Sequence, residues 1–275
     1  MAVTINTNVG SLSAQKNLSA TQASLSKSFA RLSSGYRINS AADDAAGLAI
    51  SDSMQAQIRS YTVAGRNTND GVSMAQTADG ALGQVTDILG RMRELATQGA
   101  NGSLQTSDRA YLATEFKSLQ SEVKRILTAT KFNGQQLVTQ ASSTVSFQVG
   151  INNTSDDRIA VTFGGVHLSA LVSTATSVSG AATSAQSALD TIDAALKTVS
   201  TTRGRFGAVM NRLEITSSNI QTASLNLSAA NSRIRDVDVA SETAMLSRTQ
   251  VLSQAGTSIL AQANQSPQMA LALLR

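Results

Sequence analysis

Apolar residues recur every three, four or seven positions along most of this chain, which is typical of helices that pack lengthwise against one another. The longest run lies between residues 44 and 98. There we expect one helix roughly 80 Å long, because each helical residue adds about 1.5 Å. A second helix is expected at 104–129, and a third helical pattern runs from Leu189 to Ile234. Helices this long usually pack along other helices.

Both ends of the chain carry one narrow heptad stripe. Each stripe has three apolar residues seven positions apart, and together they form the predicted assembly seam: Leu18, Leu25 and Leu32, then Met245, Leu252 and Ile259. One stripe is too narrow to stabilise an isolated helix pair, since helices in proteins gain most of their stability from tertiary packing. We therefore expect the two ends to lie side by side and to bury their remaining faces against other copies of the chain.

The apolar period changes to two in the middle of the chain, between residues 131 and 175. Two runs alternate apolar residues with polar or small ones: Val145, Phe147 and Val149, then Ile159, Val161 and Phe163. Asn133-Gly134 and Gly164-Gly165 lie beside these runs and are typical of tight turns. The pattern predicts one or two β-hairpins.

The expected fold class is therefore mainly α. We predict a long antiparallel helical bundle or coiled-coil hairpin, with a small β-hairpin element in the middle and the termini paired. The predicted segments begin with an N-terminal helix at 1–42 and inner helices at 43–130. The β element follows at 131–175 and a returning helix at 176–233. The last segment is a C-terminal helix at 234–275, which pairs with the first.

Composition removes several chemistries. The 275 residues include no Cys, no Trp, one His, three Tyr and six Phe. Without Cys, there can be no disulfide, iron–sulfur cluster, zinc ribbon or cysteine nucleophile, and His167 alone cannot build a multi-histidine metal site. So few aromatic residues suit narrow seams between helices better than the wide core of an enzyme. We expect no enzymatic activity, no cofactor and no metal.

The formal net charge is +4, but the basic residues are spread out. Residues 1–42 hold four bases and no acid, and residues 243–275 hold two bases and no acid. Nucleic-acid sites gather Lys and Arg on one face, so we expect no nucleic-acid partner. No run approaches the ~18 apolar residues of a membrane span, and the first residues lack the regions of a signal peptide. We expect no membrane insertion, and either a cytosolic chain or one exported without a cleavable signal.

Several local features have simple structural interpretations. Ser40 and Asp43 fit a capping box that opens the next helix, and Asp44 favours the same positive helix end. His167 is expected to be structural or to face solvent. Three glycines within the long helix are expected to let a neighbouring helix approach closely: Gly80, Gly83 and Gly90.

Several long stretches resemble bacterial flagellins. The N-terminal signature is matched by residues 32–50 (LSSGYRINSAADDAAGLAI) and 93–102 (RELATQGANG). The C-terminal signature is matched by residues 227–238 (LSAANSRIRDVD) and 254–268 (QAGTSILAQANQSPQ). Two shorter matches, KFNG at 131–134 and FQVG at 147–150, lie between them. The similarity covers nearly the whole chain.

The resemblance implies the structural subunit of the bacterial flagellar filament, a helical homopolymer used for swimming. It implies export of the unfolded chain through the flagellar type III apparatus, with an export chaperone on the C-terminal segment. It also implies assembly outside the cell beneath the filament cap, next to hook-junction proteins. Residues 168–188 leave no room for the variable outer domains of many flagellins. We therefore expect a short, core-only form and a thin, comparatively smooth filament.

The resemblance also implies recognition by the Toll-like flagellin receptor of vertebrates. The family's motif is an Arg, a Leu four positions later and a Glu on the following helix, which match Arg91, Leu95 and Glu122. The residue before the Arg is commonly Gln in receptor-binding flagellins and is Gly90 here. Three leucines near the C-terminus resemble the tail read by an intracellular flagellin sensor: Leu271, Leu273 and Leu274.

Two other interpretations compete with the filament subunit. A flagellar hook-filament junction protein shares flagellin-like termini, but its middle diverges, whereas residues 131–150 match closely here. A signalling hairpin, such as the cytoplasmic module of a chemoreceptor, is also long-helical and rich in Ala, Ser and Gln. It would need a membrane anchor or a partner domain, and the sequence shows neither.

Overall fold

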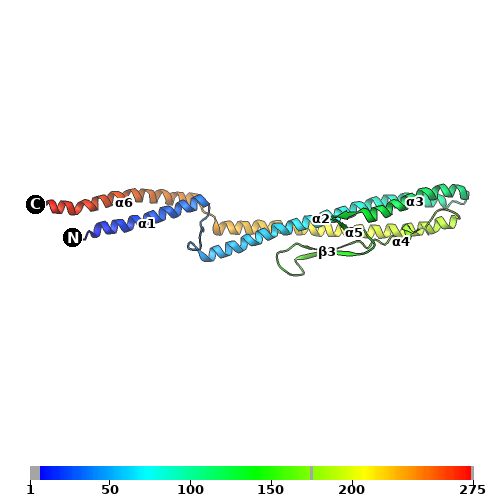
Figure 1. The fold of residues 1–275 in the computed structure, drawn as a ribbon, viewed down its shortest axis with the longest axis horizontal. Coiled ribbons are helices and arrows are strands. Elements are labelled where there is room, and N and C mark those ends of the chain that lie inside the picture. The colour runs from blue at the N-terminus through cyan, green and yellow to red at the C-terminus, as the bar shows by residue number, and fades with distance from the viewer. Residues whose placement is uncertain (1–6, 174–175, 274–275) are drawn as a thin grey trace. The chain divides into compact units, whose positions relative to one another are not determined.

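The computed structural model describes residues 7–173 and 176–273, with side chains described as far as residue 265. Its helices are α1 (Val9–Ser34), α2 (Ala45–Gly99), α3 (Thr106–Ala129), α4 (Ser169–Val172), α5 (Ala182–Arg235) and α6 (Val239–Leu273) (Figure 1). Its strands are β1 (Lys131–Phe132), β2 (Gln135–Gln136), β3 (Ser143–Gln148) and β4 (Arg158–Phe163). The mainly α fold with a small β element in the middle is confirmed.

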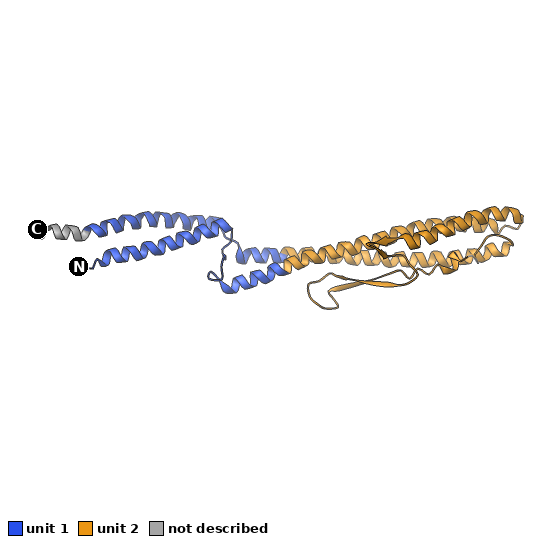
Figure 2. Ribbon diagram, in the orientation of Figure 1, with its two compact units in different colours: residues 1–56, 226–275 blue, residues 57–225 orange. Residues whose placement is uncertain are grey.

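The chain forms two compact units, shown in blue and orange in Figure 2. Unit 1 consists of residues 1–56 and 226–275, and unit 2 of residues 57–225. The predicted segment boundaries at 42 and 234 lie close to breaks between helices. The boundaries between the two units lie at other positions, after residue 56 inside α2 and after residue 225 inside α5.

In unit 1, α1 and α6 lie side by side and run antiparallel (Figure 1). The pairing direction follows from contacts at the two ends of the pair. Near one end, the Asn8 side chain bonds the carbonyl of Ala263. At the other end, Arg31 lies 3.6 Å from a Glu242 carboxylate oxygen.

A short connection joins α1 to α2 and pairs with the chain between α5 and α6. Gly35 ends α1 at a φ of 74°, the left-handed conformation that glycine adopts without steric cost. The Arg37 amide then donates to the Arg235 carbonyl at 2.7 Å, and the Val237 amide donates to the Gly35 carbonyl at 3.0 Å. These bonds hold the two connections of unit 1 together.

The start of α2 differs from the predicted capping box. Asp43 accepts bonds from Ser40 and Asn39, but these close a separate turn before the helix. Asp44 caps α2 instead, because its side chain accepts the Gly47 amide at 2.9 Å. The turn is not continued into the helix, so α2 needs a cap of its own at the next residue.

Unit 2 buries the heptad positions of α5 against α2 and α3. Its buried residues on α5 fall seven apart: Ile192, Val199, Phe206, Leu213 and Ile220. The predicted stripe of α2 is likewise buried in this unit, at Leu82, Val85, Leu89, Met92 and Ala96. The helical spacing therefore identified the main core of unit 2.

The predicted β element, expected as one or two hairpins, consists of two. β1 and β2 are joined by Asn133 and Gly134, with φ values of 47° and 81°, as a type I′ turn requires. β3 and β4 pair antiparallel, with Val145 opposite Val161. One side of this second hairpin packs on the helices, where the Phe163 and Phe206 ring centroids are 5.6 Å apart.

Two buried polar side chains anchor the irregular segments of unit 2. Arg109 donates to the carbonyls of Gly99 and Asn101 at 2.9 Å each and to that of Gly180 at 3.3 Å. Gln120 donates to the Leu171 carbonyl at 2.7 Å. Its side-chain amide also donates to the carbonyls of residues 173 and 176. Because a buried charge without hydrogen bonds is costly, this full set of acceptors is what allows Arg109 to be buried.

The glycine prediction is wrong for the three residues named. A Cβ atom placed on Gly80 or Gly90 would meet no atom within 4 Å, and one on Gly83 would meet only the end of the Arg203 side chain. One glycine of α2 that neighbouring elements do approach closely is Gly71. A Cβ there would lie 3.1 Å from Leu213 and 3.3 Å from the Phe147 ring. The sequence pattern could not tell the packed glycine from the exposed ones.

Candidate assembly surface and recognition residues

The surface between α1 and α6 is made mainly of small and polar residues. Side chains that turn toward the partner helix fall at steps of three and four, as in a coiled coil. On α1 these are Ser11, Ala14, Leu18, Thr21, Leu25, Ser28 and Leu32, and on α6 they are Glu242, Leu246, Thr249, Ser253, Gly256, Leu260 and Ala263. The pair thus buries little apolar area within the chain.

Large apolar side chains lie on the outer faces of the same two helices. Their side chains are between 49% and 66% exposed: Val9, Leu12, Phe29, Val239, Met245, Val251, Leu252 and Ile259. A soluble helix pair normally has the opposite arrangement, with its apolar stripe facing the partner. Large apolar side chains left exposed at heptad spacing, such as Met245, Leu252 and Ile259, are typical of an interaction site.

The six predicted seam residues therefore divide into two sets. Leu18, Leu25 and Leu32 are half-buried on the side of α1 that faces α6. The Leu18 side chain lies directly against Gly256. Met245, Leu252 and Ile259 lie on the exposed face of α6. Heptad spacing found both stripes but could not show which partner each one faces.

The basic residues of the acid-free N-terminal segment find partners from elsewhere in unit 1. Lys27 pairs with Asp43 at 2.7 Å, and Arg31 lies between Asp43 and Glu242. The Lys27 ammonium is the main reason that the pKa of the Asp43 carboxyl lies well below its usual range. The Arg37 guanidinium donates to the Ile234 carbonyl.

Arg235 links the start of the connection in unit 1 to the early turns of α2. Its guanidinium lies 4.5 Å from the centre of the Tyr36 ring, a cation–π arrangement, and 3.6 Å from Asp52. These contacts add to the ion pairs around Asp43. Sequence reasoning missed this cluster because its members are separated by about two hundred positions, a distance that no local pattern reveals.

Arg91 lies on the outside of α2 in unit 2, and its side chain is about half exposed. Its Nε donates to Glu115 on α3 at 2.8 Å, and its Nη1 donates to Glu94 at 2.8 Å. These two carboxylates, Glu115 first, raise the pKa of Arg91 above its ordinary value. The guanidinium is thus oriented by acids on two helices.

The structure does not bring together all three predicted receptor residues. Leu95 is 1% exposed and belongs to the hydrophobic core of unit 2. Glu122 bonds Arg125 on its own helix and lies about 10 Å along α3 from Glu115, the residue that bonds Arg91. Of the three residues, Arg91 and Glu122 present charged atoms at the surface.

The predicted C-terminal sensor residues have no described contacts. The side chains of Leu271 and Leu273, and the whole of Leu274, lie outside the described part of the structure.

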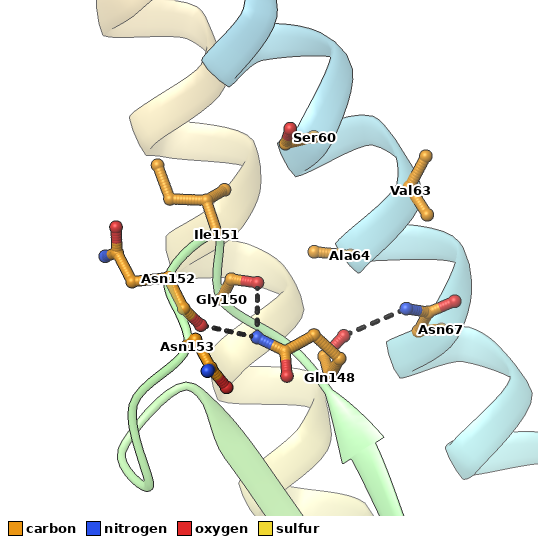
Figure 3. A pocket seen from close by; sticks show the side chains of 9 residues that line it. All are labelled: Ser60, Val63, Ala64, Asn67, Gln148, Gly150, Ile151, Asn152 and Asn153. Atoms are coloured by element: carbon orange, nitrogen blue, oxygen red, sulfur yellow. Dashed lines mark hydrogen bonds between the residues drawn. The ribbon is translucent and has the colours of Figure 1, made fainter.

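One surface cavity of unit 2 is lined without any titratable group. The cavity has a volume of about 400 Å³ and lies between α2 and the chain that follows β3 (Figure 3). Its nine lining residues include no titratable side chain. Its amides bond neighbouring backbone, with Asn67 donating to the Gln148 carbonyl at 3.0 Å. His167 is exposed, as expected.

The described residues contain neither a metal-binding cluster nor a membrane-spanning helix. Residues 7–173 and 176–273 contain no group of three or more His, Asp or Glu side chains placed to hold a metal ion. No helix in the same ranges is both long enough and apolar enough to cross a membrane.

Comparison with known proteins gives two family matches that together span most of the chain. Residues 5–143 match the bacterial flagellin N-terminal helical region, and residues 189–274 match the bacterial flagellin C-terminal helical region. Between them, the described residues form β3, β4 and α4 and the segments that join them.

Individual relatives agree with this assignment. Flagellin of Halalkalibacterium halodurans is 48% identical over 274 residues, covering 98% of this chain and 99% of that protein. B-type flagellin of Pseudomonas aeruginosa is 53% identical over 152 residues, covering 55% of this chain but only 31% of the longer relative.

A solved structure of a putative flagellar hook-associated protein from Vibrio parahaemolyticus superimposes with a TM-score of 0.60. It covers 70% of this chain and 100% of that one at 16% identity, a likeness of fold alone. The nearly full-length match to a short flagellin shows the core-only form. The chain therefore belongs to the bacterial flagellin family, whose members are structural subunits of the flagellar filament and not enzymes.

Proposed function

We propose that this chain polymerises by burying the outer faces of α1 and α6 against the same helices of other copies. The observation that supports this is the distribution of side chains in unit 1. Small and polar residues make up most of the contact between the two helices, with five Leu among them, while eight large apolar side chains remain exposed on the same helices. A second copy offers the complementary apolar surface, and helical repetition lets every copy use it twice.

The magnitudes favour a polymer that depends on these side chains. Burying the exposed half of a Val, Leu, Ile or Phe side chain contributes about 1 kcal/mol. Eight of them therefore contribute an amount similar to the ~4–15 kcal/mol that association costs in lost freedom. The free energy gained by apolar burial and the free energy lost on association are nearly equal. Losing a few apolar side chains should therefore prevent assembly.

Delivery of the chain to its site of assembly belongs to the same proposal. The chain is secreted by the flagellar type III apparatus as an unfolded polypeptide, with a chaperone on its C-terminal segment, and it is added beneath the filament cap beyond the hook-junction proteins. Its lack of Cys is compatible with this route, because no disulfide has to be made or broken during threading.

Deletion of residues 260–275 tests the assembly proposal. The shortened chain should stay helical by circular dichroism, because the core of unit 2 lies in residues 57–225. It should form no filaments after heat dissociation and cooling, as judged by negative-stain microscopy. Full-length protein treated in parallel is the control. Long filaments of the shortened chain would show that the end of α6 is dispensable.

A second proposed role is recognition by the Toll-like flagellin receptor through Arg91, Leu95 and Glu122. The exposure of the Arg91 guanidinium supports it, since a receptor can reach this group in the monomer. Leu95 is buried, so it would act by holding the α2 surface in shape rather than by direct contact.

Receptor activation by purified monomer tests this role. Arg91→Ala combined with Leu95→Ala should abolish the response, whereas Arg203→Ala, at an ion pair with Asp79 that involves none of the three residues, should not. A response unchanged by the double substitution would refute the assignment.

A further inference from the structure

Pro267, the single proline of the chain, lies inside α6. Proline has no backbone N–H, so it cannot donate to the carbonyl four residues earlier in a helix. That carbonyl belongs to Ala263, which is half-buried on the side of α6 that faces α1. An unpaired carbonyl in such a position is unfavourable, and it requires a donor from outside the helix.

Asn8 supplies that donor. Its Nδ2 donates to the Ala263 carbonyl at 2.8 Å, across the contact between α1 and α6. At the same time its Oδ1 accepts the Ser11 amide at 3.0 Å, which makes Asn8 the N-cap of α1. One side chain thus begins α1 and completes the hydrogen bonding of α6. The neighbouring Ser11 hydroxyl bonds Asn264 at 2.7 Å.

The rest of the α1–α6 contact does not fix its own alignment strongly. Nine of its fourteen facing residues are small or polar and the other five are Leu, and they recur every three or four positions, so a shift of one heptad often replaces a side chain by a similar one. The carbonyl opened by Pro267 is different, because it occurs once in the chain. A shift by seven residues would leave Ala263 unpaired and Asn8 facing a carbonyl that is already bonded.

We propose that Asn8 sets the register of α1 against α6 by bonding the carbonyl that Pro267 leaves open, so that the terminal pair enters the polymer already aligned. The inference rests on the proposed assembly of this chain through α1 and α6. A single register matters for a polymer, because the outer apolar stripes of the two helices must present the same combined surface in every copy.

The test measures the register of α1 against α6 by disulfide cross-linking, in a chain that has no natural Cys. A Cβ atom on Gly256 would lie 3.9 Å from Leu18 Cβ, within the separation of about 3.5–4.5 Å that disulfides require. Leu18→Cys with Gly256→Cys therefore reports the native register. Leu18→Cys with Thr249→Cys reports a shift of one heptad.

Asn8→Ser is the decisive variant. Ser keeps an N-cap acceptor for α1 but is too short to reach α6. It should lower the yield of the native cross-link and raise that of the shifted one. The ratio should change roughly two- to tenfold, the equilibrium factor of one ordinary hydrogen bond. With Pro267→Ala, residue 267 regains its N–H, and Asn8→Ser should then leave the ratio unchanged.

An equal effect of Asn8→Ser in both backgrounds would overturn the proposal, and so would no effect in either. Absence of the native cross-link from monomer with Asn8 and Pro267 intact would do so as well, since no aligned pair would then exist before assembly. Filament formation is scored separately by negative-stain microscopy. Failure of the unmodified chain to polymerise would refute the assembly proposal but not the register measured in monomer.

Discussion

The Lys27 ammonium lies 2.7 Å from Asp43 Oδ1, and this ion pair joins α1 to the connection that follows it. Asp43 also lies 3.9 Å from Arg31, which reaches Glu242 on α6. The first 42 residues contain no acid of their own. Two of their four bases, Lys27 and Arg31, are therefore balanced by acids just beyond that segment and on the returning helix, which ties the terminal pair together electrostatically.

Acid should weaken unit 1 through Asp43. Lys27, and then the amides of Ser40 and Asn39, hold the pKa of this carboxyl below its usual range, while burial opposes them. A depressed folded-state pKa means that the stabilisation is complete above the unfolded value, about 3.9, and is lost as pH falls below it. Thermal unfolding of the full chain, followed by circular dichroism from about pH 5 to pH 2, should show the loss.

Asp43→Asn provides the control for this acid effect. It removes the titrating group but keeps a side chain of the same shape, so the variant should be less stable at neutral pH and should lose less stability on acidification. An unchanged acid dependence in Asp43→Asn would show that the effect does not come from Asp43.

The outer face of α6 should control polymerisation without controlling monomer stability. Leu252→Ser and Ile259→Ser together remove two half-exposed side chains, each contributing about 1 kcal/mol to association. The critical concentration for filament growth should rise about tenfold or more, because 1.4 kcal/mol corresponds to a factor of ten. Sedimentation of polymer at a series of protein concentrations measures it.

The matched variant for the outer face is Leu18→Ser. Leu18 packs on Gly256 in the same chain, so this change should loosen the α1–α6 pair in the monomer itself. Hydrogen exchange of α1 should therefore accelerate in Leu18→Ser and not in the Leu252/Ile259 variant. Equal acceleration in both would contradict the division of the seam into inner and outer stripes.

Glycine replacements should separate exposed from packed positions on α2. Gly80→Ala should stabilise unit 2 by about 0.5–1 kcal/mol, because Ala favours the helix more than Gly does and the added methyl meets open space. Gly71→Ala should gain less or lose stability, since its methyl would press on Leu213 and Phe147. Chemical denaturation of the two variants tests the difference, and the opposite order would contradict the packing around Gly71.

Arg109 should be among the most sensitive polar residues of unit 2. Arg109→Met removes bonds to three carbonyls at the end of α2 and near the start of α5, and should cost about 2–4 kcal/mol. Arg109→Lys keeps the charge but cannot span the three acceptors, so it should recover only part of this loss. Urea denaturation measures both, and full recovery by Lys would show that charge alone matters.

Much of the fold could be predicted because it depends on local periodicity. The long α2 and α5 helices, the strands around Val145 and Val161 and the turn at Asn133 all follow from spacing or turn chemistry within a few residues. The Ser40–Asp43 cap was misplaced by a few positions. The spacing of a cap motif does not show whether the turn that it closes continues into the helix.

The candidate sites were less predictable. Heptad spacing found Leu18 and Leu252 alike, but only their surroundings separate an inner contact from an exposed one. Burial of Leu95, and the bond of Arg91 to Glu115 and not to Glu122, depend on how α2 and α3 are rotated about their axes. That rotation is set by packing of the whole core, which no motif contains.

By itself, the sequence determined the helical architecture, the absence of cysteine chemistry and the family, because each depends on residue types and short-range spacing. Tertiary structure alone decided which apolar stripe stays exposed, which acids balance the terminal bases and where the carbonyl opened by Pro267 finds its donor. Those relationships join residues more than two hundred positions apart in the cases of Arg31 with Glu242 and Asn8 with Ala263. They arise only when the antiparallel packing of α1 and α6 brings the two ends of the chain together.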